Sequence, residues 1–409
     1  MAKDTYMKPS QLINEVNAQY TQQILAYSGT QDSKKCIIKR IRKKEDRGIE
    51  VEDNLEDFVV PHPLDTTISG SPFLISHILT HPFLISNMKD PSNVILMFTT
   101  EENLDHLSHA KYWVMDGTFK SAPNIFYQIY TIHGYVGGDA TGRTFPFVYF
   151  LLSNKTEETY RKALKELEKA MGQREVTTRL IITDFEKAMI NAVKHELADD
   201  IEHGGCYFHF RQSFARKAKQ RGLAKKLGND IDFAEKFNML SALAFLPPDA
   251  IPSAFDTLAS LFPEEENVES FLEYVEKNYI RGKITRIRRN HPVRGPPKFP
   301  PEFWSVHQRT VQGLPRTQNA IEGWHNRLNG LISSPHPSPL KCVELIRKEE
   351  HTTTAEVRRL LRSGGSISTR RINLRAREGK IQELLQSWET MPLMAFLQSV
   401  LERLRHAAP

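Results

Sequence analysis

The middle of the chain has blocks of apolar residues that predict a sheet. Residues 112–119, 124–136 and 144–153 are rich in Val, Ile, Tyr and Phe and are separated by short polar stretches. This pattern is typical of three antiparallel strands joined by turns. Residues 178–184 form a continuous apolar run, as expected for a strand buried on both faces, and residues 201–210 predict a short fifth strand.

Helical periodicity lies between and after the later strands. Residues 156–172 begin with Thr156 as a predicted N-cap and end at Gly172, and residues 185–197 and the basic stretch from about 211 are also helical in pattern. The predicted order is three strands, helix, strand, helix, strand, helix. We therefore expect an α/β protein with a mixed sheet, of the kind seen in ribonuclease-H-like folds.

The chain as a whole divides into three regions. Residues 1–105 form an accessory region interrupted by prolines, with one strand and a short helix at 93–110. The predicted core covers 106–335 and is interrupted at 226–315 by an insertion that we expect to be all-helical, because strand patterns stop there. Residues 336–409 predict a basic, helical C-terminal region.

Composition excludes several classes of protein. The 409 residues are 40% hydrophobic and 25% charged, which is typical of a globular protein with a sizeable core. No apolar run is long enough to cross a membrane, and the first residues do not have the pattern of a secretory signal. The three cysteines lie far apart in sequence, which fits a reducing compartment better than a disulfide framework.

Basic residues are clustered along the chain. Residues 211–226 contain seven Lys or Arg and no acid, residues 281–316 contain a single acid, and seven arginines lie within 358–377. Such clusters suit DNA, although each alone could be solvated surface. The run at 34–47 could be a nuclear-import signal, a DNA-contacting arm, or a solvated strand or loop. We expect a nuclear protein that binds DNA through residues such as Arg211, Arg286, Arg288 and Arg289.

Two aspartates come at the ends of predicted strands. Asp116 ends the first strand and Asp184 ends the fourth, and in open α/β sheets ligands collect at this edge. Glu322, within a predicted helix over 317–332, could complete a cluster. Carboxylates brought together repel each other, and a divalent cation such as Mg²⁺ or Mn²⁺ would remove that cost. The alternative is that both aspartates simply end strands, as Asp often does in turns.

Four segments together resemble a known family. They lie at 113–134, 181–193, 206–213 and 316–330, and they resemble in order the motifs of the Mutator-like element (MULE) transposase domain. The resemblance implies a ribonuclease-H-like core with a helical insertion before the glutamate helix. It also implies a catalytic and metal-binding triad of Asp116, Asp184 and Glu322.

The activity implied by this resemblance is DNA transposition. A metal-dependent enzyme would cleave DNA at transposon ends and join the released 3′-hydroxyl to target DNA, with Asp116 bridging two ions. We expect transposon ends and target DNA as partners, a homo-oligomer, and no membrane. Two alternatives stay open, namely a domesticated DNA-binding regulator without catalysis and a ribonuclease-H-like nuclease that does not transfer strands.

The resemblance also singles out Cys206 and His209. Two ligands at this Cys-x-x-His spacing do not fill a tetrahedral Zn²⁺ shell, and His203 and His325 are candidate further ligands. The alternative, which we favour, is that Cys206 packs in the core while His209 makes a hydrogen bond at the junction between strand and helix.

Other residues near Glu322 are candidates for lesser roles. His325 lies three residues after Glu322 on the same helix face, where it could orient the carboxylate or contact a DNA phosphate. Asn319 could cap the helix or contact DNA. We interpret Trp324 as a packing residue rather than a base-stacking one. We interpret Glu186 as an acid at a helix N-terminus rather than a metal ligand.

The N-terminal region departs from the family pattern. Such transposases often carry a Cys/His zinc finger before the core, but residues 1–105 contain only Cys36 with three histidines at no finger spacing. Recognition of transposon ends would then depend on the insertion, the tail or a partner protein.

Overall fold

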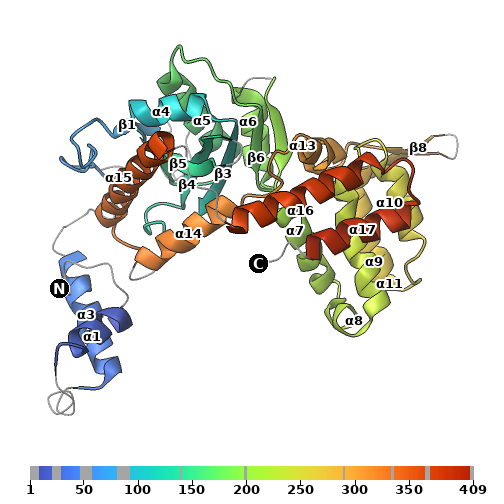
Figure 1. Ribbon diagram of the computed structural model, residues 1–409, viewed down its shortest axis with the longest axis horizontal. Helices are drawn as coiled ribbons and strands as arrows, with labels where there is room; N and C mark the ends of the chain where they lie inside the picture. The colour runs from blue at the N-terminus through green and yellow to red at the C-terminus, as the bar shows by residue number, and fades with distance from the viewer. Residues whose placement is uncertain are drawn as a thin grey trace, which may run out of the picture.

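The computed structural model describes most of the chain. The described residues are 9–20, 29–46, 58–80, 93–138, 141–197, 200–288, 291–332, 336–363 and 369–405. They form a lobe built on a mixed β-sheet, a second lobe made mainly of helices, and a small N-terminal pair of helices (Figure 1).

The sheet has seven strands in the order β1-β2-β5-β4-β3-β6-β7. The pairs from β1 to β3 are antiparallel, whereas β6 runs parallel to β3 and β7 runs parallel to β6. The predicted meander and the two crossover strands are therefore confirmed. The strands are β1 (Leu74–Thr80), β2 (Asn93–Phe98), β3 (Tyr112–Thr118), β4 (Gln128–Val136), β5 (Arg143–Leu152), β6 (Leu180–Thr183) and β7 (Glu202–Gly205).

Two details of the sheet differ from the sequence prediction. Strand β1 was not predicted, because prolines on both sides of it obscure its pattern, yet it pairs with β2 and extends the sheet. Strand β7 ends at Gly205, and the aromatic residues that follow belong to helix α7 (Tyr207–Gln220). The rings of Tyr207 and Phe210 enter the core of the helical lobe, so tertiary packing overrides the β-propensity of this aromatic stretch.

Helices cover both faces of the sheet. Trp113, Met115 and Ile132 pack against one group of helices, while the alternate residues Val114 and Ile129 pack on the opposite side. The first face is covered by α4 (Glu101–Ser108), α5 (Glu157–Met171) and α6 (Lys187–Glu196), and the second by α14 (Asn319–Leu331) and the first part of α15 (Pro339–Ser363).

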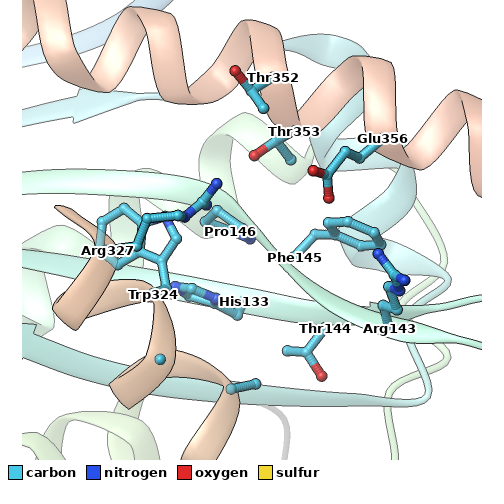
Figure 2. A pocket seen from close by; sticks show the side chains of 12 residues that line it. His133, Arg143, Thr144, Phe145, Pro146, Trp324, Arg327, Thr352, Thr353 and Glu356 are labelled. Carbon is cyan, nitrogen blue, oxygen red and sulfur yellow. The ribbon is translucent and has the colours of Figure 1, made fainter. Parts of the chain in front are cut away.

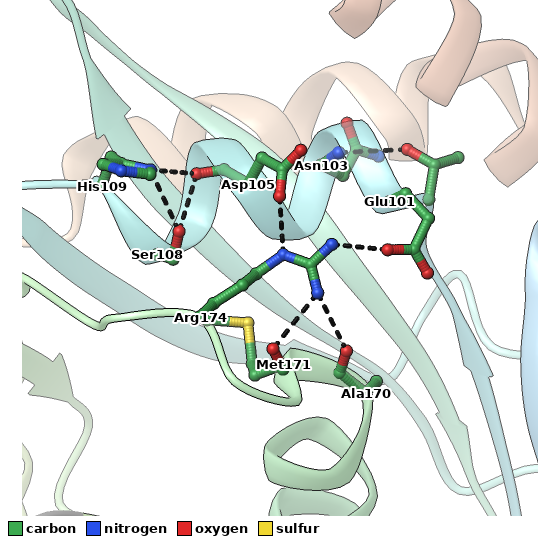
Figure 3. Close-up of polar contacts among 9 residues, drawn as sticks. Glu101, Asn103, Asp105, Ser108, His109, Ala170, Met171 and Arg174 are labelled. Atoms are coloured by element: carbon green, nitrogen blue, oxygen red, sulfur yellow. Dashed lines mark hydrogen bonds and ion pairs between the residues drawn. The ribbon is translucent and has the colours of Figure 1, made fainter.

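The helices on the first face are fixed by caps and by one arginine. Thr156 and Thr100 accept hydrogen bonds from backbone amides at the starts of α5 and α4, as predicted for Thr156. Arg174 follows α5, where its guanidinium donates to Asp105 and to the carbonyls of Ala170 and Met171 (Figure 3). This side chain therefore ties the end of α5 to α4.

The second lobe has its own aromatic core, which includes Phe210, Phe214, Phe271, Tyr279 and Trp304. Its elements come from two separate parts of the chain, and the C-terminal helices lie beside α9 and α13. They are α7, α8 (Ala224–Asn229), α9 (Ile231–Ala242), η1 (Leu243–Phe245), α10 (Ile251–Ala259), α11 (Glu266–Val275), the π-helix η2 (Glu276–Ile280), α12 (Pro301–Trp304), α13 (His307–Val311), α16 (Thr369–Gln386) and α17 (Leu393–Arg405).

The sequence predicts an all-helical insertion, but the structure shows a β-hairpin within it. Strands β8 (Ile284–Arg288) and β9 (His291–Arg294) pair as an antiparallel hairpin. The prediction was wrong because Arg and Thr interrupt the apolar pattern. The two strands pair through their backbones, and even Ile284 and Ile287 are exposed rather than buried in a core.

The N-terminal part contains helices α1 (Pro9–Asn17) and α3 (Gln31–Asp46), which pack on each other through Leu12, Ile13 and Ile38. The basic run at 34–47 therefore lies largely in a helix, not in a strand or loop. Within the described segments, no helix combines the length and the apolar character that a membrane crossing needs.

Candidate active site

Parallel pairing brings Asp116 and Asp184 to the same edge of the sheet. In the register between β3 and β6, Val114 lies opposite Ile182, so each aspartate comes two residues after a paired position. Asp116 lies in β3 and Asp184 directly follows β6. Asp116 shares the sheet face of Val114, because side chains alternate along a strand, and this face is the one that α14 covers.

Gln318 fixes the start of α14 over these two strands. Its side chain is fully buried, and its Nε2 donates to the carbonyl oxygens of Met115 at 2.7 Å and Ile182 at 3.2 Å. These carbonyls belong to the residue before Asp116 and to the second residue before Asp184. One side chain therefore holds the helix N-terminus against both strands that carry the aspartates.

Glu322 lies in the first turn of α14. Its backbone N–H donates to the carbonyl of Gln318 at 3.2 Å, so its position follows from that of Gln318. Oxygen Oε1 of Glu322 is buried and has no hydrogen-bond partner. The negative charge of Glu322 acts on Asp116, so the three acids named from the sequence interact electrostatically.

Asp116 is held in a surrounding that disfavours its charge. Burial and then repulsion from Asp184 raise its pKa from 3.8 to about 8. The hydrogen bond that the Gly117 N–H donates to Oδ1 at 2.8 Å lowers the pKa but does not offset these effects. The His325 Nδ1 lies 3.8 Å from Asp116 Oδ2, but burial lowers the pKa of His325 to about 4. At neutral pH, the two groups therefore face each other uncharged, with Asp116 protonated.

Asp184 has a second acid beside it. Burial raises the pKa of Asp184, whereas the hydrogen bond from the Glu186 N–H, and then the nearby Lys155 and Arg216, lower it. The Glu186 N–H donates to Asp184 Oδ1 at 3.1 Å, and Tyr160 donates its hydroxyl to Glu186 Oε2 at 3.1 Å.

Glu186 lies at the N-cap position of α6, as the sequence suggested, but its side chain makes no cap hydrogen bond. Burial and then repulsion from Asp184 raise its pKa. Its charge also acts on Asp116, which adds it to the acidic group. The hydrogen bond from Tyr160 joins Glu186 to another helix, so no local pattern in the sequence could reveal it.

The acids do not yet form a closed metal site. In the part of the chain that the structure describes, no three His, Cys, Asp or Glu side chains are close enough together to hold a metal ion. The site is thus a group of partly buried acids that disfavour ionisation of Asp116, and one buried oxygen, Glu322 Oε1, lacks a hydrogen bond.

The Cys-x-x-His pair lies where strand β7 passes into helix α7. Cys206 is the fully buried N-cap residue of α7. Burial raises the pKa of its thiol to about 11, although hydrogen bonds from backbone amides, including that of Gln318, act to lower it. His203 instead contacts the Thr183 hydroxyl at 2.9 Å and the ring of Phe303. His209 packs edge-on against Phe208, and its Nδ1 is buried without a hydrogen-bond partner.

The remaining sequence candidates lie at several places. Asn319 is exposed at the first residue of α14, and Arg211 is exposed with its guanidinium over the ring of Tyr207. Arg286 is exposed on the β8–β9 hairpin of the helical lobe, and Arg288 ends β8. Arg289 lies outside the described residues.

Trp324 is a packing residue, as interpreted from the sequence. It is buried, and its ring contacts the rings of His133 and Tyr149. A pocket of about 210 Å³ opens beside it between α14, α15 and strands β4 and β5, with Arg143 and Arg327 on its wall (Figure 2). The pocket residues of α14 point away from the helix face that carries Glu322 and His325.

Comparisons with known proteins agree with the motifs. Residues 112–213 match the family model of the MULE transposase domain. The resemblance seen in the sequence is therefore confirmed over this segment. The segment includes Asp116, Asp184 and the Cys206–His209 pair and ends before Glu322. No curated protein matches the chain.

Among solved structures, the Drosophila P element transposase strand transfer complex matches with 13% sequence identity and a TM-score of 0.26. The match covers 63% of this chain and 82% of that chain. A TM-score this low does not establish a shared fold.

Proposed function

We propose that the chain is the core of a DNA transposase that cleaves and joins DNA strands at a site formed by Asp116, Asp184 and Glu322. The five strands β5-β4-β3-β6-β7, with three antiparallel and two parallel members, have the arrangement expected for a ribonuclease-H-like sheet. The MULE transposase match over the two aspartate strands supports the same class. The partner would be DNA, and the location would be the nucleus.

The observation that carries this proposal is the double hydrogen bond of Gln318. It joins the glutamate helix to the two aspartate strands, although these three elements are far apart in sequence. A structural glutamine alone would not need to place Glu322 beside Asp116, where burial and repulsion raise the aspartate pKa. Acids kept together against their mutual repulsion are typical of a site that receives a cation.

The donor set fits Mg²⁺ or Mn²⁺, because carboxylate oxygens are the ligands these ions prefer. Asp116, Asp184 and Glu322 would hold the metal, and Glu186 lies beside them. When bound, the metal would polarise the phosphodiester and stabilise the charge that develops on its oxygens. The side chains would have to move closer together than they are now, since no three of them are yet within reach of one ion.

The chain's own residues would orient the acids and the substrate. The Gly117 N–H holds Asp116 through Oδ1, and the neutral His325 lies beside Oδ2 without competing for the site as a cation. His209 and Arg216 lie close enough to Asp184 to act on its charge, so they are placed to contact a DNA phosphate brought to these acids. Such contacts position DNA without reading its sequence.

One observation favours a second function, a DNA-binding protein without catalysis. The acids as they stand do not form a three-ligand metal site, and a former transposase could keep the fold while losing the chemistry. Zn²⁺ at Cys206 and His209 has less support, since no third His, Cys, Asp or Glu of the described segments completes a metal site with them.

Metal binding and strand cleavage separate these functions. We would measure Mn²⁺ binding by electron paramagnetic resonance, and nicking and joining of supercoiled plasmid DNA with Mg²⁺ or Mn²⁺. The wild-type chain should bind Mn²⁺ and nick DNA, and Asp116→Asn should lose both. Asp249→Asn is the matched control, because Asp249 is an exposed aspartate between η1 and α10.

The outcomes are distinct. DNA binding with no Mn²⁺ binding would contradict the enzymatic proposal and support the binding protein. Nicking that survives Asp116→Asn would show that the reaction uses other residues. Nicking without joining would identify a nuclease.

A further inference from the structure

Two aromatic side chains are exposed in the loop between β3, which carries Asp116, and β4. Phe119 follows the end of β3 and is 45% exposed, and Tyr127 precedes β4 and is 43% exposed. Their rings meet edge to face, with 5.3 Å between centroids. The Lys155 ammonium lies 5.6 Å from the Phe119 ring and 5.3 Å from the Tyr127 ring. We call these three residues the aromatic platform.

The loop that carries Phe119 and Tyr127 is anchored to the rest of the lobe, and this anchoring keeps both rings exposed. Phe126, next to Tyr127, is buried and packs edge-on against Phe58. The Tyr127 N–H donates to the Leu152 carbonyl at 2.8 Å. Ser121 is buried and hydrogen-bonds to Asn329 of α14. The loop therefore turns inward between Phe119 and Tyr127 and holds these two rings outside.

The platform lies beside the acidic group. The charges of Glu186 and Asp184 act on Lys155, and Lys155 in turn acts on Asp184. The Lys155 ammonium donates a hydrogen bond to the Tyr127 hydroxyl, and this contact raises the Lys155 pKa. A cation and two partly exposed rings therefore lie at the edge of a site whose acids would otherwise repel a DNA phosphate.

We propose that Phe119, Tyr127 and Lys155 hold an unpaired nucleotide of the DNA strand that is being processed, with the base on an aromatic ring and its phosphate at the ammonium. The inference rests on the proposed function, because it assigns the DNA strand to the acid site. Every base has a π-face, so stacking accepts any sequence, and a lysine contacts phosphate as a point charge. In a paired duplex the base faces are already covered by their neighbours, so the platform selects unpaired ends.

Fluorescent oligonucleotides test this without any cleavage. Duplexes with a short single-stranded end would carry 2-aminopurine in the unpaired part, with Ca²⁺ in place of a catalytic metal. Stacking on the platform should quench the fluorescence of the wild-type complex. Phe119→Leu and Tyr127→Leu should each weaken binding of the unpaired end by roughly tenfold and remove the quenching. Phe119→Trp should retain both the binding of the unpaired end and the quenching, because tryptophan also has an aromatic face.

The matched control is Tyr20→Leu, since Tyr20 is an exposed aromatic residue of the N-terminal part, away from the sheet. Blunt duplex should bind the leucine variants as well as it binds the wild type. Equal binding of unpaired ends by the wild type and both leucine variants would overturn the inference, as would an equal loss for blunt duplex. Failure of the wild type to bind an unpaired end would overturn it as well.

Plasmid nicking distinguishes this inference from the proposed function. If unpaired ends bind through the platform but no metal-dependent nicking occurs, the platform stands and the enzymatic proposal fails. If nicking requires Asp116 while the leucine variants bind unpaired ends normally, the enzyme stands and the platform fails.

Discussion

Replacing Asp116 by asparagine should stabilise the metal-free protein while abolishing its response to metal. The pKa of Asp116 is raised from 3.8 to about 8, so the folded state keeps a proton that the unfolded state releases. The shift is about four units, and each unit corresponds to ~1.4 kcal/mol, which gives an upper limit of ~6 kcal/mol at alkaline pH. Because side chains rearrange and water enters the site, we expect about 2–4 kcal/mol.

The sign follows from the direction of the shift. A carboxyl group with a raised pKa leaves stability intact below its unfolded pKa of 3.8, and the loss accumulates as the pH rises toward about 8. Wild-type stability should therefore fall between pH 5 and pH 8, whereas Asp116→Asn should lose less over the same range. The asparagine keeps the size of the side chain and can still accept the hydrogen bond from the Gly117 N–H.

Urea denaturation with a chelator present, at pH 5 and pH 8, measures both effects. Adding Mg²⁺ at pH 8 should raise the free energy of unfolding of the wild type, by mass action, and leave the Asp116→Asn variant unchanged. Asp249→Asn should behave as the wild type throughout. The reasoning would be refuted if Asp116→Asn were no more stable than the wild type at pH 8 with the chelator.

Three further variants test how the site is held. Gln318→Leu should lower the free energy of unfolding by about 2–3 kcal/mol in urea, because two buried carbonyls lose their donor, while Gln308→Leu, at an exposed position of α13, should have little effect. Arg174→Ala should cost about 1–2 kcal/mol by the same measurement, and a value near zero would show that the exposed carboxylates contribute nothing. Cys206→Ala should cost about 1 kcal/mol and leave thermal unfolding insensitive to chelator, whereas a much larger, chelator-sensitive loss would indicate zinc.

The strands that carry the aspartates could be predicted because their signals are local. Residues 178–184 form one apolar run, and β6 is buried along its whole length. Helix α5 has its N-cap at Thr156 and ends before Gly172, both of which can be recognised within a few residues. Hydrophobic periodicity and capping depend on near neighbours, so they survive without any knowledge of the tertiary structure.

The contacts that define the site could not be predicted because they join distant segments. Gln318 reaches carbonyls of β3 and β6, and backbone carbonyls leave no mark on the sequence. Lys155 and Glu186 lie just before α5 and α6, and their charges act on the aspartates. Neither residue lies at a recognisable sequence spacing from Asp116. The β8–β9 hairpin was missed for a different reason, since its exposed Arg and Thr residues give no buried face to recognise.

Glu322 keeps its place although residues 208–315 separate its helix from the sheet. The Tyr207 N–H at the start of α7 donates to the Arg316 carbonyl at 2.9 Å, so the chain leaves and re-enters the sheet lobe at bonded positions. Arg309 adds a second tie through its hydrogen bond to the Gly205 carbonyl. Closing so long a loop costs only slightly more entropy than closing one half its length, and the inserted segment forms a core of its own. The position of α14 is thus set at the base of the insertion, by Gln318 and Arg316. The surface residues of the helical lobe can then change without moving the acids.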